Sequence, residues 1–317
     1  MRALLGSGGI GTDERRELYR DLMSENFADC QRVILVPFAS NDYDGYTERM
    51  QEFAGQSGYE LVGLHEFEDP LAAIEAMDGI YVGGGNTWLL VRALHERGLI
   101  EPIRDAVLQR GVPYAGVSAG ANVACPSMQT TNDMAVTMVP SFETFGIVPF
   151  QINPHYHPGG IWYRESEDGE FQQHFGETRA RRVTEYHQTN NIPVIGLYEG
   201  SFLRCKDNSF ELLGNKGAVM RKDEEINTFE PRGVLGGSVV LPHGQGNVAD
   251  DVDLLLVGVR RDLSGPCGLP GVPRSHAARG LPDGIRPSTG MLPAALRRIA
   301  DVCAPRPDTV SYTHLRA

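Results

Sequence analysis

The first 125 residues alternate short apolar runs with amphipathic stretches, and this alternation constrains the fold more than any other feature. The helix-like stretches occupy residues 13–25, 46–58 and 86–98. Strands separated by helices of this length are typical of βαβ units, in which helices cover both faces of a parallel sheet. We therefore expect an α/β fold with a mostly parallel sheet flanked by helices. The predicted strands are Ala3–Leu5, Arg32–Ala39, Glu60–His65, Gly79–Val82 and Val112–Val117.

The following part of the chain, from about Met134 to Arg232, is less regular. It contains short apolar runs at irregular intervals and no internal repeat. The elements predicted there are strands near Phe150–Ile152, Val194–Tyr198 and Phe210–Leu213, and a helix near Thr178–Tyr186.

The last segment, residues 233–317, has a different composition. It contains no Lys, Glu, Phe or Trp, yet it holds nine of the 20 prolines of the chain. A segment so poor in aromatic residues cannot easily offset its ordering entropy by burial. We interpret it as a tail that is either disordered or an artefact of translation in a wrong frame, and the apolar run DVDLLLVGV leaves room for one short ordered element.

The charge and the apolar runs exclude two classes of partner. The formal net charge is −12 and the pI is about 5.2, whereas proteins that bind the phosphate backbone need clustered Lys and Arg. No apolar run approaches the length of a membrane span, and the N-terminus lacks the apolar core of a secretory signal. We therefore expect a cytoplasmic protein, a monomer or a homodimer, with no nucleic-acid or membrane partner.

The five cysteines are widely spread and form no CxxC pair. Their odd number and spacing predict neither a disulfide framework nor a zinc site. We interpret them as buried or incidental thiols.

A serine stands between glycines in the stretch GVSAG, where an apolar run gives way to a helix-like segment. At a junction of this kind a nucleophile needs small neighbours two positions away, and Gly116 and Gly120 meet that need. The amide of Ala119 would then face an oxyanion at the start of the helix. The pattern favours Ser118 as a nucleophile, with a simple helix N-cap as the alternative.

A serine nucleophile needs a base within hydrogen-bonding reach and an acceptor that orients the base. His155 lies just past a predicted strand, in the stretch NPHYH, and Asp133 and Glu199 are acids at predicted turns that could hold the imidazole. Only 37 positions separate Ser118 from His155, which differs from the α/β-hydrolase order, where the histidine lies far downstream. The pair of His155 and His157 alone is weak evidence for a metal, and we expect none.

Five motifs follow one another along the chain: VGGGNTW, GVSAGANVACP, TTNDM, QINPHY and GETR. Together they resemble the serine peptidase family that contains peptidase E, an α-aspartyl dipeptidase, and cyanophycinase. The resemblance runs from about residue 2 to about residue 231, so we assign residues 1–232 to one catalytic domain. It implies a fold related to class I glutamine amidotransferases and to flavodoxin-like proteins. It also implies a serine exopeptidase that cleaves dipeptides after an N-terminal aspartate, without metal or cofactor.

The resemblance also implies a role for each motif. Ser118 matches the nucleophile and His155 matches the base. Asp133 and Glu199 match the two acids that could complete the relay, and we slightly favour Asp133.

The other matches concern the oxyanion and the substrate. The glycine loop, with Gly84 and Gly85, resembles the loop that supplies the second oxyanion donor beside Ala119. The substrate-binding candidates are Asn86 and Arg179. We expect Arg179 to pair with the aspartyl carboxylate, because a guanidinium binds a carboxylate with two parallel hydrogen bonds.

Three other interpretations remain. The same nucleophile could cleave β-aspartyl peptides or cyanophycin, or the chain could be an inactive relative that acts as a binding module. The stretch GSGGIG fits the GxGxxG pattern of dinucleotide-binding proteins, but the strand after it, at 32–39, does not end in the acid that would hold a ribose. NAD or FAD binding is therefore disfavoured.

Overall fold

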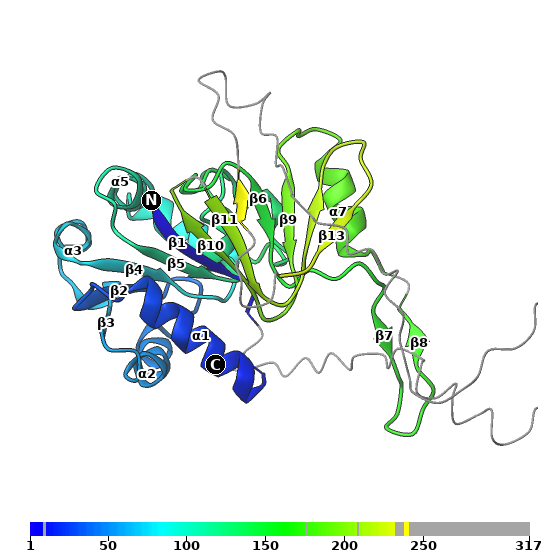
Figure 1. The fold of residues 1–317 in the computed structure, drawn as a ribbon, viewed down its shortest axis with the longest axis horizontal. Coiled ribbons are helices and arrows are strands. Elements are labelled where there is room, and N and C mark those ends of the chain that lie inside the picture. The colour runs from blue at the N-terminus through cyan, green and yellow to red at the C-terminus, as the bar shows by residue number, and fades with distance from the viewer. Residues whose placement is uncertain (9–10, 175, 208, 232–237, 241–317) are drawn as a thin grey trace, which may run out of the picture. The chain divides into compact units, whose positions relative to one another are not determined.

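The computed structural model describes residues 1–8, 11–174, 176–207, 209–231 and 238–240 (Figure 1). All of them belong to one compact unit. Apart from Ser238–Val240, the predicted tail lies outside the described residues, so the interpretation of that tail stays a prediction. The same holds for the domain boundary at residue 232.

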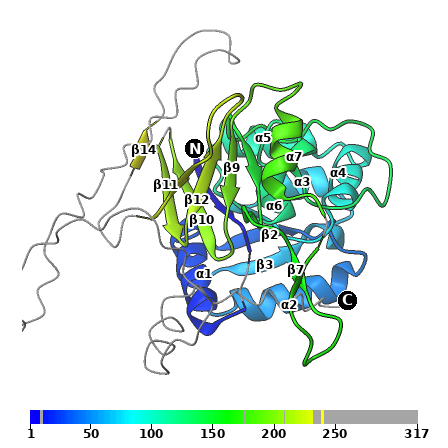
Figure 2. The same ribbon diagram turned by 90° about the vertical axis from the view of Figure 1, so that its right-hand side faces the viewer.

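The main sheet has eight strands and is parallel over most of its width (Figures 1 and 2). Its strands are β1 (Arg2–Gly6), β2 (Arg32–Val36), β3 (Glu60–Gly63), β4 (Gly79–Val82), β5 (Tyr114–Val117), β10 (Ser201–Lys206), β11 (Ser209–Gly214) and β14 (Ser238–Val240). Their order is β14-β11-β10-β1-β5-β4-β2-β3. The five strands predicted from the first part of the chain form the parallel portion, and β10, β11 and β14 extend it as antiparallel strands. The predicted fold class is confirmed.

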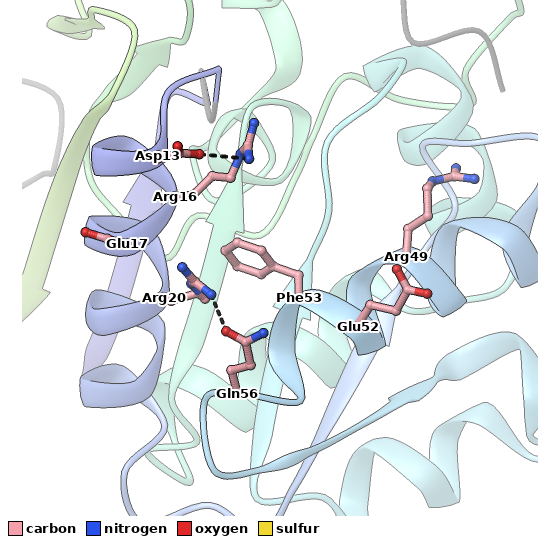
Figure 3. Close-up of a pocket in the computed structure, with 8 residues that line it drawn as sticks. All are labelled: Asp13, Arg16, Glu17, Arg20, Arg49, Glu52, Phe53 and Gln56. Carbon is pink, nitrogen blue, oxygen red and sulfur yellow. Dashed lines mark hydrogen bonds and ion pairs between the residues drawn. The ribbon is translucent and has the colours of Figure 1, made fainter.

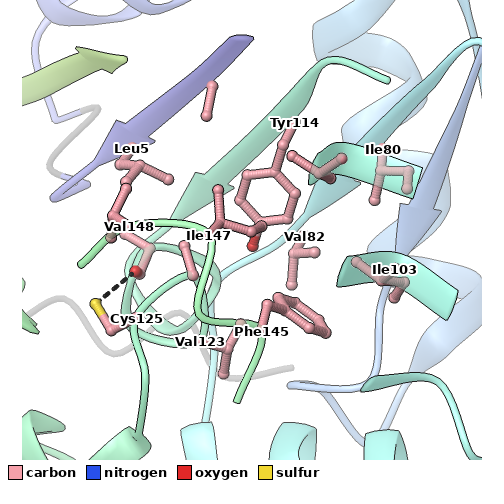
Figure 4. Close-up of a cluster of buried hydrophobic side chains, with 14 of the residues drawn as sticks. Leu5, Ile80, Val82, Ile103, Tyr114, Val123, Cys125, Phe145, Ile147 and Val148 are labelled. Atoms are coloured by element: carbon pink, nitrogen blue, oxygen red, sulfur yellow. Dashed lines mark hydrogen bonds between the residues drawn. The ribbon is translucent and has the colours of Figure 1, made fainter. Parts of the chain in front are cut away.

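Helices lie on both faces of this sheet (Figure 1). They are α1 (Asp13–Asn26), α2 (Tyr43–Ala54), α3 (Pro70–Ala76), α4 (Thr87–Glu96), α5 (Ile100–Leu108), α6 (Ala119–Asn122) and α7 (Arg179–Tyr186), with 3-10 turns η1 (Leu64–Glu66) and η2 (Met128–Thr130). Alternate strand residues point to opposite faces. Ala3 and Leu5 of β1 therefore join a buried cluster that includes residues of α3, α4 and α5. Figure 4 shows Leu5 in this cluster, together with Ile103 of α5. Leu4 joins a second cluster, with residues of α1 and α2.

Most helix starts are explained by polar caps in the sequence. Thr12, Asp42, Asp69 and Asn86 each accept hydrogen bonds from backbone amides in the first turn of the helix that follows. Pro70 at the first position of α3 adds a backbone that is already helical. The sequence patterns did not predict α3 and α5, which have seven and nine residues.

A second sheet of four strands is built from the less regular part of the chain (Figure 2). Its strands are β6 (Gln151–Asn153), β9 (Val194–Leu197), β12 (Gly217–Met220) and β13 (Asn227–Phe229). The predicted strands near 150–152 and 194–198 and the predicted helix near 178–186 are confirmed, whereas β12, β13 and the hairpin of β7 (Trp162–Tyr163) and β8 (Gln172–Gln173) were not predicted. The chain reaches Ser118, His155 and Glu199 within two residues of the ends of β5, β6 and β9. Because β6 and β9 are parallel neighbours in the second sheet, His155 and Glu199 follow at the same edge of that sheet, whereas Ser118 follows β5 of the main sheet.

Candidate active site

Ser118 lies in a tight turn between β5 and α6. Its backbone has φ 57° and ψ −111°, an uncommon conformation for a residue other than glycine. A Cβ at Gly116 would lie 2.3 Å from the carbonyl oxygen of Gly120, and a Cβ at Gly120 would lie 2.0 Å from that of Val82. Both glycines are therefore required by space, as the sequence predicts for a nucleophile turn.

The side chains of Ser118, His155 and Glu199 form a line of two hydrogen bonds. Ser118 Oγ lies 2.8 Å from His155 Nε2, and His155 Nδ1 lies 2.6 Å from Glu199 Oε1. If Nδ1 carries the proton, it donates to the carboxylate and leaves Nε2 free to accept the serine proton. This is the arrangement of a serine, a general base and an orienting acid.

The charges around Glu199 favour its ionised form. Burial alone would raise the pKa of this carboxyl, but the hydrogen bond from His155 and the electrostatic interactions with His155, Arg15 and Arg179 outweigh burial and lower the pKa below its ordinary value. Glu199 is therefore ionised at neutral pH. The side chains of His155 and Glu199 are 34% and 40% exposed, so the imidazole is open to a small molecule.

Asp133, the acid that we favoured from the sequence, does not touch His155. Its Oδ2 accepts hydrogen bonds from the amide and hydroxyl of Thr87 at 2.7 and 2.6 Å, and from the hydroxyl of Thr131 at 3.3 Å. Thr87 opens α4, where a carboxylate also interacts favourably with the helix dipole. The structure thus brings Glu199 to the base and uses Asp133 to hold the start of a helix.

The glycine loop after β4 lies beside the nucleophile. A Cβ at Gly84 would lie 3.2 Å from Ser118 Cβ, and a Cβ at Gly85, where φ is 137°, would lie 2.4 Å from the carbonyl oxygen of Ala39. The loop can therefore approach closely only because these residues are glycines.

The predicted oxyanion donors differ in what their amides do. The amide of Gly84 donates to the hydroxyl of Tyr46 at 3.0 Å, so it is already engaged. Within the part of the chain that the structure describes, no hydrogen bond occupies the amide of Gly85. Ala119 is the first residue of α6, so its amide lies outside the hydrogen bonds of that helix. Gly85 and Ala119 are the two predicted donors that the structure leaves open.

The two predicted substrate-binding residues have different surroundings. Asn86 caps α4, since its Oδ1 accepts from the amides of Trp88 and Leu89 at 3.0 and 3.2 Å. Its Nδ2 lies 3.4 Å from the carbonyl oxygen of Met134, so the side chain is committed to holding this loop. Arg179 opens α7 and is half-buried, and its positive charge contributes to the lowered pKa of Glu199.

Sequence reasoning missed several residues around the base. His157 is half-buried, and its burial and the charge of Arg179 lower its pKa. Ser7 and Gly8 contact His155. The signal for Ser7 and Gly8 was GSGGIG, a pattern that we weighed as a dinucleotide loop. The signal for His157 was its spacing from His155, which we weighed as a metal pair.

A surface pocket of about 520 Å³ lies between α1 and α2 (Figure 3). Its charges nearly balance, and none of the predicted site residues lines it. Three arginines and three acids are among the lining residues, which are Asp13, Arg16, Glu17, Arg20, Arg49, Glu52, Phe53 and Gln56.

No group of three or more His, Cys, Asp or Glu side chains in the described part of the chain could hold a metal ion. None of the described helices is both long enough and apolar enough to cross a membrane. Cys30, Cys125 and Cys205 are buried free thiols, as predicted, whereas Cys267 and Cys303 lie outside the described residues.

The chain is similar in sequence and in fold to known proteins. The model of the family described as Peptidase family S51 matches residues 3–213. Peptidase E of Streptomyces coelicolor is 44% identical over 190 residues, which cover 59% of this chain and 73% of that protein. The Drosophila melanogaster protein named Probable alpha-aspartyl dipeptidase is 43% identical over 195 residues, which cover 62% and 78%. A crystal structure of a peptidase from an acI-B1 Actinobacterium has a TM-score of 0.54 at 18% identity, covers 75% of this chain and 96% of that one, and supports the fold alone.

Proposed function

Since the chain belongs to peptidase family S51, we propose that it is a serine dipeptidase of the peptidase E type, which hydrolyses dipeptides with an N-terminal aspartate. The observation that carries the proposal is the line of hydrogen bonds from Ser118 through His155 to Glu199, at 2.8 and 2.6 Å. Such a line is what a serine needs in order to attack a peptide carbonyl at neutral pH.

The reaction follows from this geometry. His155 Nε2 takes the proton from Ser118 Oγ as the oxygen attacks the carbonyl carbon. The imidazolium then gives the proton to the departing amine, which leaves an aspartyl ester on Ser118. Water, activated by the same imidazole, hydrolyses the ester and releases free aspartate. The negative charge of Glu199 stabilises the imidazolium in both halves of the cycle.

The negative charge on the substrate carbonyl oxygen also needs hydrogen-bond donors. We assign this role to the amides of Gly85 and Ala119, because the amide of Gly84 already donates to Tyr46. Backbone donors fixed in place before the reaction stabilise the tetrahedral intermediate at no reorganisation cost.

We assign recognition of the aspartyl side chain to Arg179. A half-buried guanidinium whose charge acts on Glu199 lies near the reacting groups, and it would pair with a carboxylate through two hydrogen bonds. A neutral side chain in the substrate would leave this cation without that partner, which polar sites discriminate against strongly.

The test measures which amino acid the full chain releases from Asp-X, Asn-X, Glu-X and β-Asp-X dipeptides: free aspartate, asparagine or glutamate. We expect kcat/KM for α-linked Asp-X to exceed that for Asn-X by at least about 100-fold. Arg179→Met should remove most of this preference. Arg181→Met is the matched control, because Arg181 lies on the same helix, is 70% exposed and pairs with Glu185.

Two results would overturn the proposal. Preferential cleavage of β-Asp-X would show that the chain is a β-aspartyl peptidase instead. A folded chain that releases no amino acid from any of the four would support a binding role instead.

We also infer a cytoplasmic monomer or homodimer. Buried free thiols at Cys30, Cys125 and Cys205 support a reducing compartment. Light scattering coupled to size-exclusion chromatography would measure the mass of the particle. A trimer or larger assembly would contradict the inference.

A further inference from the structure

The loop after β1 contacts the base, and we propose that the hydroxyl of Ser7 positions His155 and the turn of Glu199 for catalysis. The inference rests on the proposed function, because it assigns His155 the role of general base. Ser7 is fully buried and its hydroxyl bonds to the backbone of His155 and Leu197, so it is a positioning residue.

The hydroxyl of Ser7 links two segments that are far apart in the sequence. Its Oγ accepts a hydrogen bond from the amide of His155 at 2.8 Å and donates one to the carbonyl oxygen of Leu197 at 2.9 Å. A serine hydroxyl has one donor proton and can accept at the same time, so both bonds can form together. Apolar side chains can do neither.

His155 depends on this bond more than an ordinary residue would. Its backbone has φ 52°, in the left-handed region that non-glycine residues rarely adopt. Such a conformation persists only where the surroundings hold it. Without Ser7 Oγ, the amide of His155 loses its partner, and the backbone is free to relax toward a commoner conformation. A rotation there would move the imidazole away from Ser118 Oγ.

The same loop also braces the turn that carries Glu199. Leu197, which accepts the Ser7 hydroxyl, is two residues before Glu199. The amide of Ser7 donates to the carbonyl oxygen of Ser201, and the amide of Gly200 donates to that of Gly8, both at 2.9 Å. Hydrogen bonds with residues 7 and 8 therefore hold the chain on both sides of Glu199. His155 and the turn of Glu199 are therefore held by the same loop, residues 7 and 8.

Gly8 provides the space for the imidazole. Its φ is 121°, and a Cβ there would lie 2.8 Å from His155 Cε1. The ring therefore packs directly against the backbone of Gly8, on a side that any other residue would block. Ser7 and Gly8 thus supply a buried hydroxyl and a close backbone approach to His155.

The test compares Ser7→Ala with Ser201→Ala in the full chain. Both serines are fully buried, and the hydroxyl of Ser201 donates to the carbonyl oxygen of Lys216 without contact to His155 or Glu199. We expect Ser7→Ala to lower kcat for Asp-X by about 10- to 100-fold at nearly unchanged KM. Ser201→Ala should keep kcat within about threefold of wild type. Ser7→Thr, which keeps a hydroxyl, should recover part of the loss.

A second readout does not depend on the substrate. The proton that His155 Nδ1 shares with Glu199 should give a resolved downfield proton NMR signal in the wild type and in Ser201→Ala. Ser7→Ala should shift or broaden this signal. If Ser7→Ala does not fold, Gly8→Ala probes the same support, and it should lower kcat in the same way while Gly58→Ala does not. Gly58 also has a positive φ, 90°, but no atom lies within 4 Å of its Cβ position.

The outcomes separate this inference from the proposed function. A wild-type chain that cleaves no Asp-X refutes the proposed function, and the NMR comparison then decides the role of Ser7 alone. A folded Ser7→Ala chain with the kcat and the downfield signal of Ser201→Ala would overturn the inference. So would an equal loss of kcat in the two variants.

Discussion

Replacing Glu199 by glutamine removes the negative charge that faces His155 Nδ1. The hydrogen bond that loses its charge is short, 2.6 Å, and joins two charged groups when the imidazole is protonated. A glutamine oxygen can still accept from Nδ1, but it carries no charge. Hydrogen bonds to charged groups contribute about 1.5–3 kcal/mol, and partial exposure of this pair argues against a larger figure. A loss of about 1.5–3 kcal/mol in the transition state lowers kcat about 10- to 160-fold.

Asp133→Asn is the matched control, because Asp133 is the acid in the family motif that lies away from the base. It removes a charge that binds Thr87 at the start of α4. We expect the free energy of unfolding to fall by about 1–2 kcal/mol, from the loss of a charged cap and of its interaction with the helix dipole. kcat should fall less than about tenfold.

The assay is steady-state release of aspartate from one Asp-X dipeptide by the wild type, Glu199→Gln and Asp133→Asn, together with urea unfolding of each. A larger loss of kcat in Asp133→Asn than in Glu199→Gln would contradict the role given to Glu199. So would a kcat of Glu199→Gln within about threefold of wild type.

The pH dependence of stability provides a further check on Glu199. Because its pKa is lowered in the folded chain, ionised Glu199 contributes stability that is complete above its ordinary pKa of 4.5 and is lost as the pH falls through the lowered value. The difference in unfolding free energy between wild type and Glu199→Gln should therefore shrink on acidification below pH 4.5. A difference that grows instead would contradict the lowered pKa.

Three more predictions concern single residues. Gly120→Ala should lose nearly all activity and about 1–3 kcal/mol of unfolding free energy, because its Cβ would lie 2.0 Å from the carbonyl oxygen of Val82. A soluble, active variant would contradict this prediction. Tyr46→Phe leaves the amide of Gly84 without its acceptor and should cost about 1–3 kcal/mol in urea unfolding, with a lower kcat; unchanged values would refute it. Burial lowers the pKa of His157 from 6.5, so its neutral form contributes stability above pH 6.5 that is lost as the pH falls. His157→Gln should therefore lose less thermal stability than the wild type as the pH falls below 6.5. An equal loss in the two chains would contradict this prediction.

Much of the fold could be predicted from local patterns. The alternation of apolar runs and amphipathic stretches predicted the five parallel strands, because each βαβ unit is a local feature of the sequence. The sequence also indicated Ser118, His155 and Glu199 as candidate catalytic residues, since each lies just past an apolar run. The sequence did not predict short elements such as α3 and β12, because four to seven residues show too little periodicity to be recognised.

The choice between two acids was beyond local reasoning. Asp133 and Glu199 are both acids at predicted turns, and only the pairing of β6 with β9 brings one of them to His155. The engagement of Gly84 likewise depends on Tyr46, which lies on α2, 38 positions away. Such contacts between distant segments are set by packing and leave no pattern in a single sequence.

The most direct test of the account is one comparison of aspartate release, from an α-linked Asp-X dipeptide, by the full wild-type chain and by Ser118→Ala. The account predicts steady release by the wild type and a fall in kcat of at least about 10³-fold in the variant, with a thermal unfolding midpoint within a few degrees of wild type. Release that persists in Ser118→Ala would show that hydrolysis does not use this serine as the nucleophile, and would contradict the proposed mechanism.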